Sequence, residues 1–153
     1  MFNRILCPVD FHDNSLDALR MARRLAEQNK AKLYALHVVP LTDPTVVSAP
    51  LFSEQAAQLA QAELARISNA ELAGIEHETL LRFGHPAKEI IAAEADINAD
   101  LVVMATHGRT GVSHLILGSV AEKVVRESSC PVLTVRMKAV HTSAGEELKR
   151  PAA

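Results

Sequence analysis

Apolar residues along this chain gather in short continuous runs, separated by stretches with helical spacing. The runs 4–10 and 32–39 are mostly apolar and predict the first two strands. The run 100–105 is continuously apolar after Asp100, which is typical of a strand covered on both faces of a sheet. The run 131–137 predicts another strand. In the stretch 79–83, Thr79, Leu81 and Phe83 alternate with Leu80 and Arg82, so we expect a strand near a sheet edge, with one face wetter than the other.

Four stretches between these runs carry apolar residues three or four positions apart, as amphipathic helices do. Asp13, Asn14 or Ser15 is placed to cap the first of these helices. The second is predicted over 51–73, and Gly74 is placed to end it. The predicted apolar faces comprise Ala18, Leu19, Ala22, Leu25 and Ala26; Ala56, Ala60, Leu64 and Ile67; Ala87, Ile90, Ile91 and Ala95; and Val120, Ala121, Val124 and Val125.

Strands that alternate with helices pair in parallel through right-handed crossovers. We therefore predict an α/β fold, with a five-stranded parallel sheet and helices on both of its faces. The stretch 40–50 contains three prolines and predicts a loop. A length of 153 residues suits one domain, predicted over 1–138, and we expect the polar tail over 139–153 to be mobile.

Charge and aromatic content indicate which kinds of molecule this chain is not expected to bind. The net charge is −2 and aromatic residues make up 3%, which argues against nucleic acid as a partner. No apolar run approaches the roughly 20 residues of a membrane span, and the first residues lack the apolar core of a signal peptide. We therefore expect a cytoplasmic protein without a membrane partner, in which Cys7 and Cys130 are buried, reduced thiols.

The segment between the fourth strand and the last helix is unusually rich in small residues. Gly108 and Gly111 allow the backbone to come close to a bulky group, and Gly118-Ser119 then opens a helix. The first amides of a helix have no partner within it and lie at the positive end of its dipole. Asp10 follows the first strand, and ligands of such sheets lie at the carboxyl ends of strands. This pattern favours a polyphosphate site.

A structural explanation of the same residues stays open. Ser119 and Glu122 have the spacing of a capping box, and Gly118 is explained equally well by a turn. Asp10 is also explained by its place near the start of the next helix, where the dipole stabilises a carboxylate. The sequence contains neither a Walker-type phosphate loop nor a G-x-G-x-x-G after its first strand, and its histidines fit no metal spacing.

Several motifs, in order, resemble the universal stress protein family. The family's nucleotide loop reads G-x2-G-x9-G-[ST], and here Gly108 is followed after nine residues by Gly118-Ser119. Ala105 stands where the family has its first glycine. The stretches "PVDF" at 8–11, "LHVV" at 36–39, "GHPAKEI" and "CPVLTVR" resemble the family's other strand ends, its third strand-to-helix turn and its last strand, so the likeness covers about residues 2–137.

The resemblance implies a Rossmann-like fold of the adenine nucleotide alpha hydrolase type, with strand order 3-2-1-4-5. It implies ATP binding across the strand ends, with Mg or Mn held through the phosphates. Asp10 and Val38 would contact adenine, Pro8 and Val9 would line its pocket, and Met104 and Ala105 would lie by the ribose. The phosphates would be held by Gly108, Arg109, Gly118, Ser119 and Val120. The family's dimers pair through the last strand, here 131–137.

Three functions follow from these observations. The first is a nucleotide-binding stress-response regulator, in which ATP changes the surface shown to partners. The second is an enzyme, and with Asp10 as the one obvious carboxylate we expect slow ATP hydrolysis at most. The third is a dimeric interaction module without nucleotide, which would require the Ala105 methyl group to close the site.

Overall fold

The computed structural model describes residues 1–41, 49–106 and 117–136, which form one parallel sheet with helices on both faces. The strand order is β3-β2-β1-β4-β5 and every neighbouring pair is parallel, so both the predicted fold class and the strand order are confirmed. The strands are β1 (Arg4–Pro8), β2 (Lys32–Pro40), β3 (His77–Gly84), β4 (Leu101–Ala105) and β5 (Val132–Val135).

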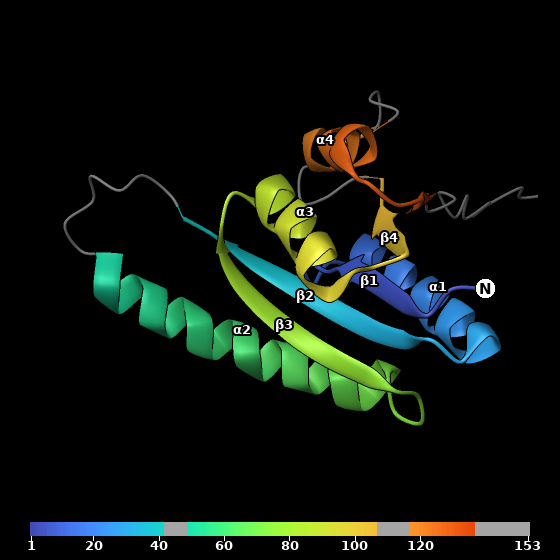
Figure 1. The fold of residues 1–153 in the computed structure, drawn as a ribbon. Helices are drawn as coiled ribbons and strands as arrows, with labels where there is room; N and C mark the ends of the chain where they lie inside the picture. Colours follow the sequence, from blue (N-terminus) through green and yellow to red (C-terminus); the bar gives the residue numbers. More distant parts are fainter. Residues whose placement is uncertain (42–48, 107–116, 137–153) are drawn as a thin grey trace, which may run out of the picture.

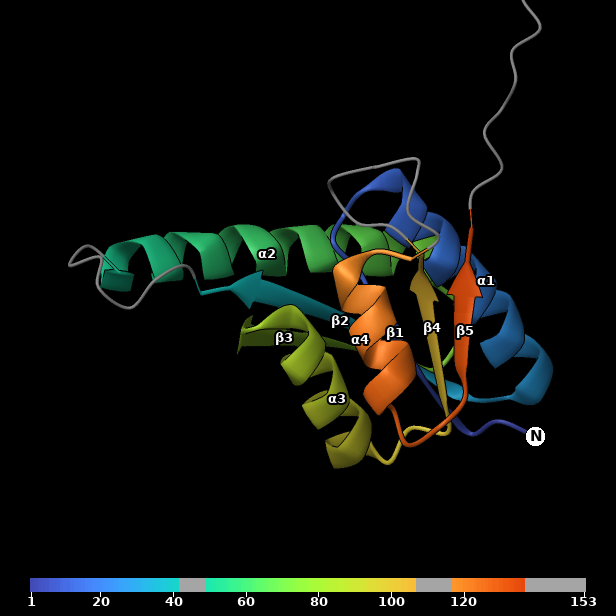
Figure 2. The same cartoon turned by 90° about the horizontal axis from the view of Figure 1, so that it is seen from above.

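Helices cover both faces of the sheet, as Figure 2 shows from above. The helices α1 and α2 pack on one face, where Leu19 and Leu64 join Ile5 and Val103 in one buried cluster. On the other face, residues of α3 and α4 pack against Leu6 and the neighbouring strands. The helices are α1 (Asp13–Asn29), α2 (Ala49–Glu71), α3 (Pro86–Ile97) and α4 (Ser119–Glu127).

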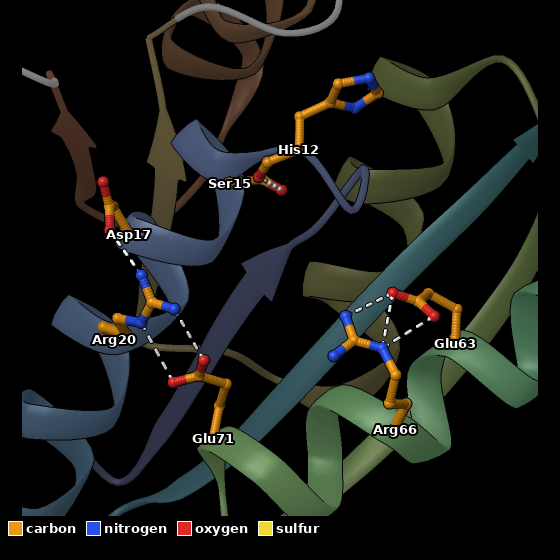
Figure 3. A network of polar contacts seen from close by, with 7 residues as sticks. All are labelled: His12, Ser15, Asp17, Arg20, Glu63, Arg66 and Glu71. Carbon is orange, nitrogen blue, oxygen red and sulfur yellow. Dashed lines mark hydrogen bonds and ion pairs between the residues drawn. The ribbon is translucent and has the colours of Figure 1, made fainter.

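The start of α1 differs from the prediction. Its N-cap is His12, with no side-chain cap, so the prediction that Asp13, Asn14 or Ser15 caps the helix is wrong. The Ser15 hydroxyl instead donates to the His12 carbonyl at 2.9 Å (Figure 3). The same hydroxyl accepts the Asp10 amide at 3.1 Å. Ser15 therefore fixes the turn that leads into the helix.

The end of α3 holds a second correction. Ala87 and Ile90 are buried as predicted, but Ala95 is exposed, and the neighbouring Glu94 is only 2% exposed. The Glu94 carboxylate turns inward because the segment between α4 and β5 supplies hydrogen-bond donors to it. An apolar repeat in sequence cannot anticipate such a distant partner.

Some smaller predictions are also decided. The first strand ends at Pro8 rather than at residue 10, and the edge position of the third strand is confirmed. Cys7 is buried and Cys130 only partly, and both are free thiols. No helix in the described part of the chain is long and apolar enough to cross a bilayer. The tail predicted over 139–153 lies outside the residues that the structure describes.

Candidate functional site

A cavity of about 380 Å³ opens at the carboxyl end of the sheet. It lies where β1, β2 and β4 end and where α3 and α4 begin, and its size falls within the range of roughly 300–1,000 Å³ typical of small-molecule pockets. Nine of the eleven predicted site residues line it together: Pro8, Val9, Asp10, Val38, Met104, Ala105, Gly118, Ser119 and Val120. The other two, Gly108 and Arg109, lie outside the described residues.

Pro8 opens the cavity on the β4 side of β1. The Val9 amide donates to Leu36 of β2, so alternation along the strand directs the backbone of Pro8 toward β4. Proline has no N–H and cannot continue a ladder there. Pairing between β1 and β4 accordingly covers only Ile5 and Leu6, and beyond them the two strands leave room for a ligand.

The edge of β2 is open on the other side of β1. Along β2 the backbone groups of successive residues point alternately to β3 and to β1. The Leu33 amide donates toward β3 and the Leu36 carbonyl accepts from Val9 after β1, so the N–H and C=O of Val38, two residues after Leu36, also face β1. The register of the two strands, however, ends at the pair Pro8 and Leu36. Among the described residues no acceptor is found for the Val38 N–H, although Val38 is only 8% exposed and lines the cavity.

The start of α4 supplies further open amides. Gly118 is the N-cap, and its carbonyl accepts the Glu122 amide at 2.8 Å as the first helical bond. The amides of Ser119, Val120 and Ala121 therefore have no acceptor within the helix, and all three residues line the cavity.

The capping-box explanation of this helix start is wrong. Ser119 is the first helical residue rather than the cap, and the N-cap forms no side-chain hydrogen bond. The helix start is instead held by the residue that follows β4, because the Gly118 amide donates to the Thr106 carbonyl at 2.6 Å. The Ser119 side chain is exposed and is not used as a cap.

Asp10 lies in the turn between β1 and α1. One of its carboxylate oxygens accepts the His12 amide at 3.1 Å, so the residue contributes to the helix start as well as to the cavity wall. The imidazole Nδ1 of His12 lies 2.9 Å from the Asp10 carbonyl. Asp10 is the only carboxylate among the cavity-lining residues that the structure describes.

Ala105 fits its position without strain. It pairs with Val135 inside the sheet and is absent from the residues that have a positive φ. Its methyl group packs against the cluster on the α1 and α2 face, whereas the side chain of Met104 joins the opposite cluster. An alanine in place of the family's first glycine therefore costs the backbone nothing.

Sequence reasoning missed several residues of the cavity wall. Pro86 and Ile90 approach from the start of α3, and Phe11 and His37 approach from the turn after β1 and from β2. All four lie within the stretches "PVDF", "LHVV" and "GHPAKEI", which resemble the family, but nothing in the sequence singled them out as part of the site. Phe11 has a φ of +67°, which is unusual for a bulky residue, and its ring stacks on His37 with centroids 4.1 Å apart.

The groups around the cavity include one buried thiol and no cluster of metal ligands among the described residues. Burial raises the pKa of the Cys7 thiol, so this cysteine beneath the site stays protonated and is a poor nucleophile. Within the described residues, no three His, Cys, Asp or Glu side chains are grouped to hold a metal ion. The groups that face the cavity are mainly backbone amides without an acceptor in the described chain and apolar side chains.

Known proteins are similar to this chain in sequence and in fold. The model of the universal stress protein family matches residues 1–136. The universal stress protein MJ0531 of Methanocaldococcus jannaschii is 36% identical over 142 residues, covering 89% of this chain and 83% of that protein.

Solved structures extend the likeness to three dimensions. MJ0577, from the same organism, gives a TM-score of 0.79 at 27% identity, over 90% of this chain and 98% of that one. A universal stress protein in complex with cAMP gives a TM-score of 0.71 at 24% identity, over 90% and 99% of the two chains. Sequence and fold agree over nearly all of the described residues, and the chain belongs to the universal stress protein family.

Proposed function

We propose that this protein binds an adenine nucleotide, ATP, in the cavity at the carboxyl end of the sheet and acts as a nucleotide-responsive regulator in the stress response. The observation that carries the proposal is the set of open backbone groups on the cavity wall. They belong to Val38 on one side and to the first turn of α4 on the other. A nearly buried amide such as that of Val38 is rarely left without an acceptor, and the first amides of a helix favour an anion, so the two together support a ligand.

The edge of β2 suits the base. Val38 presents a donor and an acceptor side by side, and adenine offers a ring acceptor beside an amino donor on its Watson–Crick edge. Hypoxanthine and guanine carry the opposite order of donor and acceptor there. Pro8, Val9 and Asp10 line the same part of the cavity, which supports the assignment of this part to the base.

The start of α4 suits the phosphates. Three amides that have no acceptor among the described residues lie at the positive end of a helix dipole and favour an anion, and the exposed Ser119 hydroxyl adds a fourth donor. Gly108 and Arg109 stay assigned to the phosphates by the family resemblance alone. Met104 and Ala105 lie between the two parts of the wall and are proposed to contact the ribose. A Mg or Mn ion would be held through the phosphates.

Relatives support the ligand class. A structure of the same fold holds cAMP, which contains adenine, a ribose and a phosphate. Rapid hydrolysis is not part of the proposal, because efficient phosphoryl transfer requires a metal carboxylate and a positioned nucleophile. Asp10 is the one carboxylate of the described wall, and it is assigned to the base. We therefore expect slow turnover at most.

We also propose that two copies associate through the last strand, over 131–137. In the described chain β5 ends the sheet, and Leu133 on it is 38% exposed. An open strand edge with an apolar side chain invites pairing with another chain. Light scattering should give twice the monomer mass, and Thr134→Pro should reduce it to the monomer; a monomeric wild-type protein would exclude this arrangement.

The ligand is tested by an equilibrium titration of purified protein with ATP, alongside two variants of the α4 start. Gly118→Val tests the approach of the ligand to the helix start, since the Gly118 φ of −69° permits valine there. We expect it to weaken binding by at least about tenfold, and Ser119→Ala to weaken it by about threefold, the loss of one hydrogen bond. Saturating ATP should also raise the melting temperature of the wild-type protein. Equal and negligible binding by all three proteins would refute the proposal.

A further inference from the structure

The ladder between β1 and β2 stops one bond short of where the strands themselves would allow. The Val9 amide donates to the Leu36 carbonyl at 2.8 Å. In a parallel ladder the next bond would run from the Val38 N–H to the Val9 carbonyl. That bond is not formed, since the register ends at Pro8 and Leu36. Instead, the Nδ1 atom of His37 lies 2.7 Å from the Val9 carbonyl oxygen.

The direction of the His37 bond follows from its partner. A carbonyl oxygen can only accept, so the Nδ1 atom of His37 carries the proton. The imidazole thus donates to the same oxygen that the next bond of the ladder would use. In this structure that oxygen is bonded by His37 and not by the Val38 amide, which is nearly buried and stays open at the wall of the cavity.

Phe11 supports the same arrangement from the other side. Its ring stacks on His37 at 4.1 Å with an angle of 24° between the planes. The φ of +67° at Phe11 is a strained value for an aromatic residue, and such strain persists only where surrounding contacts hold it. The stack and the hydrogen bond together fix the orientation of the imidazole against the turn that carries Asp10.

We infer that His37 is a positioning residue that sets the base selectivity of the site. By capping the Val9 carbonyl it keeps the Val38 N–H available to the ring acceptor of adenine. Without this cap, the ladder would extend by one bond and the donor would be lost to the base. This inference rests on the proposed nucleotide-binding function and adds to it the residue that determines which purine is accepted.

Two variants of His37 separate the hydrogen bond to Val9 from the stack on Phe11. His37→Phe keeps an aromatic ring for the stack on Phe11 and removes the donor, whereas His37→Asn keeps an N–H donor near the position of Nδ1 and removes the stack. His77→Phe is the matched control, because the His77 Nδ1 atom also lies 2.9 Å from a backbone carbonyl, that of Ile75, at the opposite end of the sheet.

Each protein is titrated with ATP and with inosine triphosphate, whose base has the size of adenine and the reverse order of donor and acceptor. We expect His37→Phe to bind ATP about tenfold more weakly, the equivalent of one hydrogen bond, and to bind inosine triphosphate as the wild-type protein does. The ATP preference should therefore fall about tenfold. His37→Asn should stay within about threefold of the wild-type preference, and His77→Phe should not alter it.

The outcomes distinguish the inference from the proposed function. If the wild-type protein bound no ATP, the proposed function would fail and the inference with it. If it bound ATP and His37→Phe kept the same preference, or His37→Asn lost as much as His37→Phe, only the inference would be overturned.

Hydrogen exchange in the wild-type protein gives a test that needs no variant. Without nucleotide, the Val38 amide should exchange at least about 100-fold faster than the Leu36 amide, which lies inside the ladder, and ATP should slow it. Equal protection of the two amides without nucleotide would show that the ladder continues, and the inference would be wrong.

Discussion

The two ends of the sheet treat their backbone amides differently. At the amino end, carboxylates of the chain itself bind amides that no strand or helix satisfies. At the carboxyl end, the amides of Val38 and of the first turn of α4 face a cavity with no carboxylate of the described chain on them. The comparison shows that the chain's own carboxylates bind the spare amides at the amino end, whereas at the carboxyl end the spare amides face the cavity.

Glu94 is the stronger example at the amino end. Its carboxylate accepts the amides of Ser129 at 2.8 Å and Cys130 at 3.2 Å, and the hydroxyls of Ser128 at 2.7 Å and Ser129 at 2.6 Å. This one side chain ties the end of α3 to the turn between α4 and β5. Asp100 acts in the same way on the first strand, where it accepts the amides of Asn3 at 2.7 Å and Arg4 at 3.0 Å.

Cavity size does not distinguish the two ends. The amino end also has a hollow, of about 560 Å³, lined by polar and charged side chains that include Arg4, Lys32 and Asp100. Several of these groups are already paired, as Lys32 is with Glu78 at 2.8 Å and Asp100 with the first strand. A ligand there would displace existing contacts, whereas a ligand at the carboxyl end would satisfy open ones.

The largest expected effect comes from removing the Glu94 carboxylate. Glu94→Ala removes the acceptor of the Ser129 amide and hydroxyl. It leaves the Ser128 hydroxyl and the Cys130 backbone with the hydrogen bonds that they make to each other. We expect the free energy of unfolding to fall by about 3 kcal/mol. Urea unfolding measures this loss. The control is Glu122→Ala, whose carboxylate is 64% exposed and pairs only with Arg126, and which should change stability little.

The pH dependence sharpens this prediction. Burial alone would raise the pKa of Glu94, but the hydrogen bonds from Ser129, Ser128 and Cys130 outweigh it and hold the pKa below its usual 4.5. A lowered pKa in the folded protein means that the stabilisation is complete above the unfolded value and is lost as the pH falls through the folded one. The stability difference between the wild-type protein and Glu94→Gln should accordingly shrink in acid, and a constant difference would contradict this account.

The second prediction gives the carboxyl end a carboxylate of its own. Ser119→Asp places a negative charge at the first position of α4, where the helix dipole stabilises it by about 0.5 kcal/mol. The same charge would repel the phosphates, and we expect ATP affinity to fall about 100-fold while the melting temperature rises. Ser119→Asn is the uncharged control of equal size. A loss of affinity as large in the asparagine variant would assign the effect to size rather than charge.

The third prediction concerns Asp100, whose carboxylate bonds amides at a more open site than that of Glu94. In Asp100→Asn one of the two carboxylate oxygens is replaced by an NH2 group, which cannot accept a hydrogen bond from the backbone N–H of Asn3 or Arg4. We expect a loss of about 1–2 kcal/mol in the free energy of unfolding. Asp96→Asn, which pairs only with the Arg82 side chain, is the control. Nucleotide binding at the opposite end should be unchanged in both variants, and a change in either would mean that the two ends are coupled.

Much of this arrangement could be predicted from the sequence, because strong local patterns encode it. Continuous apolar runs gave the buried strands, and Gly118-Ser119 before an amphipathic stretch gave the start of α4. The residues around the cavity could be named in advance for the same reason, since strand ends and helix starts are local features. Their contact with a nucleotide stays a prediction.

The sequence could not reveal which backbone groups are left open. The open amide of Val38 depends on the register of β1 against β2 and on which neighbour each residue faces. Likewise, the buried carboxylate of Glu94 depends on donors 34 to 36 positions away in the chain. Both features arise only when segments that are distant in the sequence come into contact. The helical spacing of apolar residues therefore predicted that Ala95 would be buried, and no sequence pattern indicated the contact of His37 with Val9.

The smallest expected effect comes from a carboxylate that binds no backbone amide. Glu71 at the end of α2 receives Nη2 of Arg20 at 2.8 Å and its Nε at 3.1 Å, and Arg20 also reaches Asp17 (Figure 3). The Arg20 hydrogen bonds lower the pKa of Glu71, yet the Arg20 side chain is 47% exposed, so water and salt screen the pair. A double-mutant cycle of Arg20→Ala and Glu71→Ala should give a coupling of about 0.5 kcal/mol that falls further at about 1 M salt. A coupling as large as the loss from Glu94→Ala would contradict the comparison, since bidentate geometry would then stabilise this fold as strongly as the satisfaction of buried amides does.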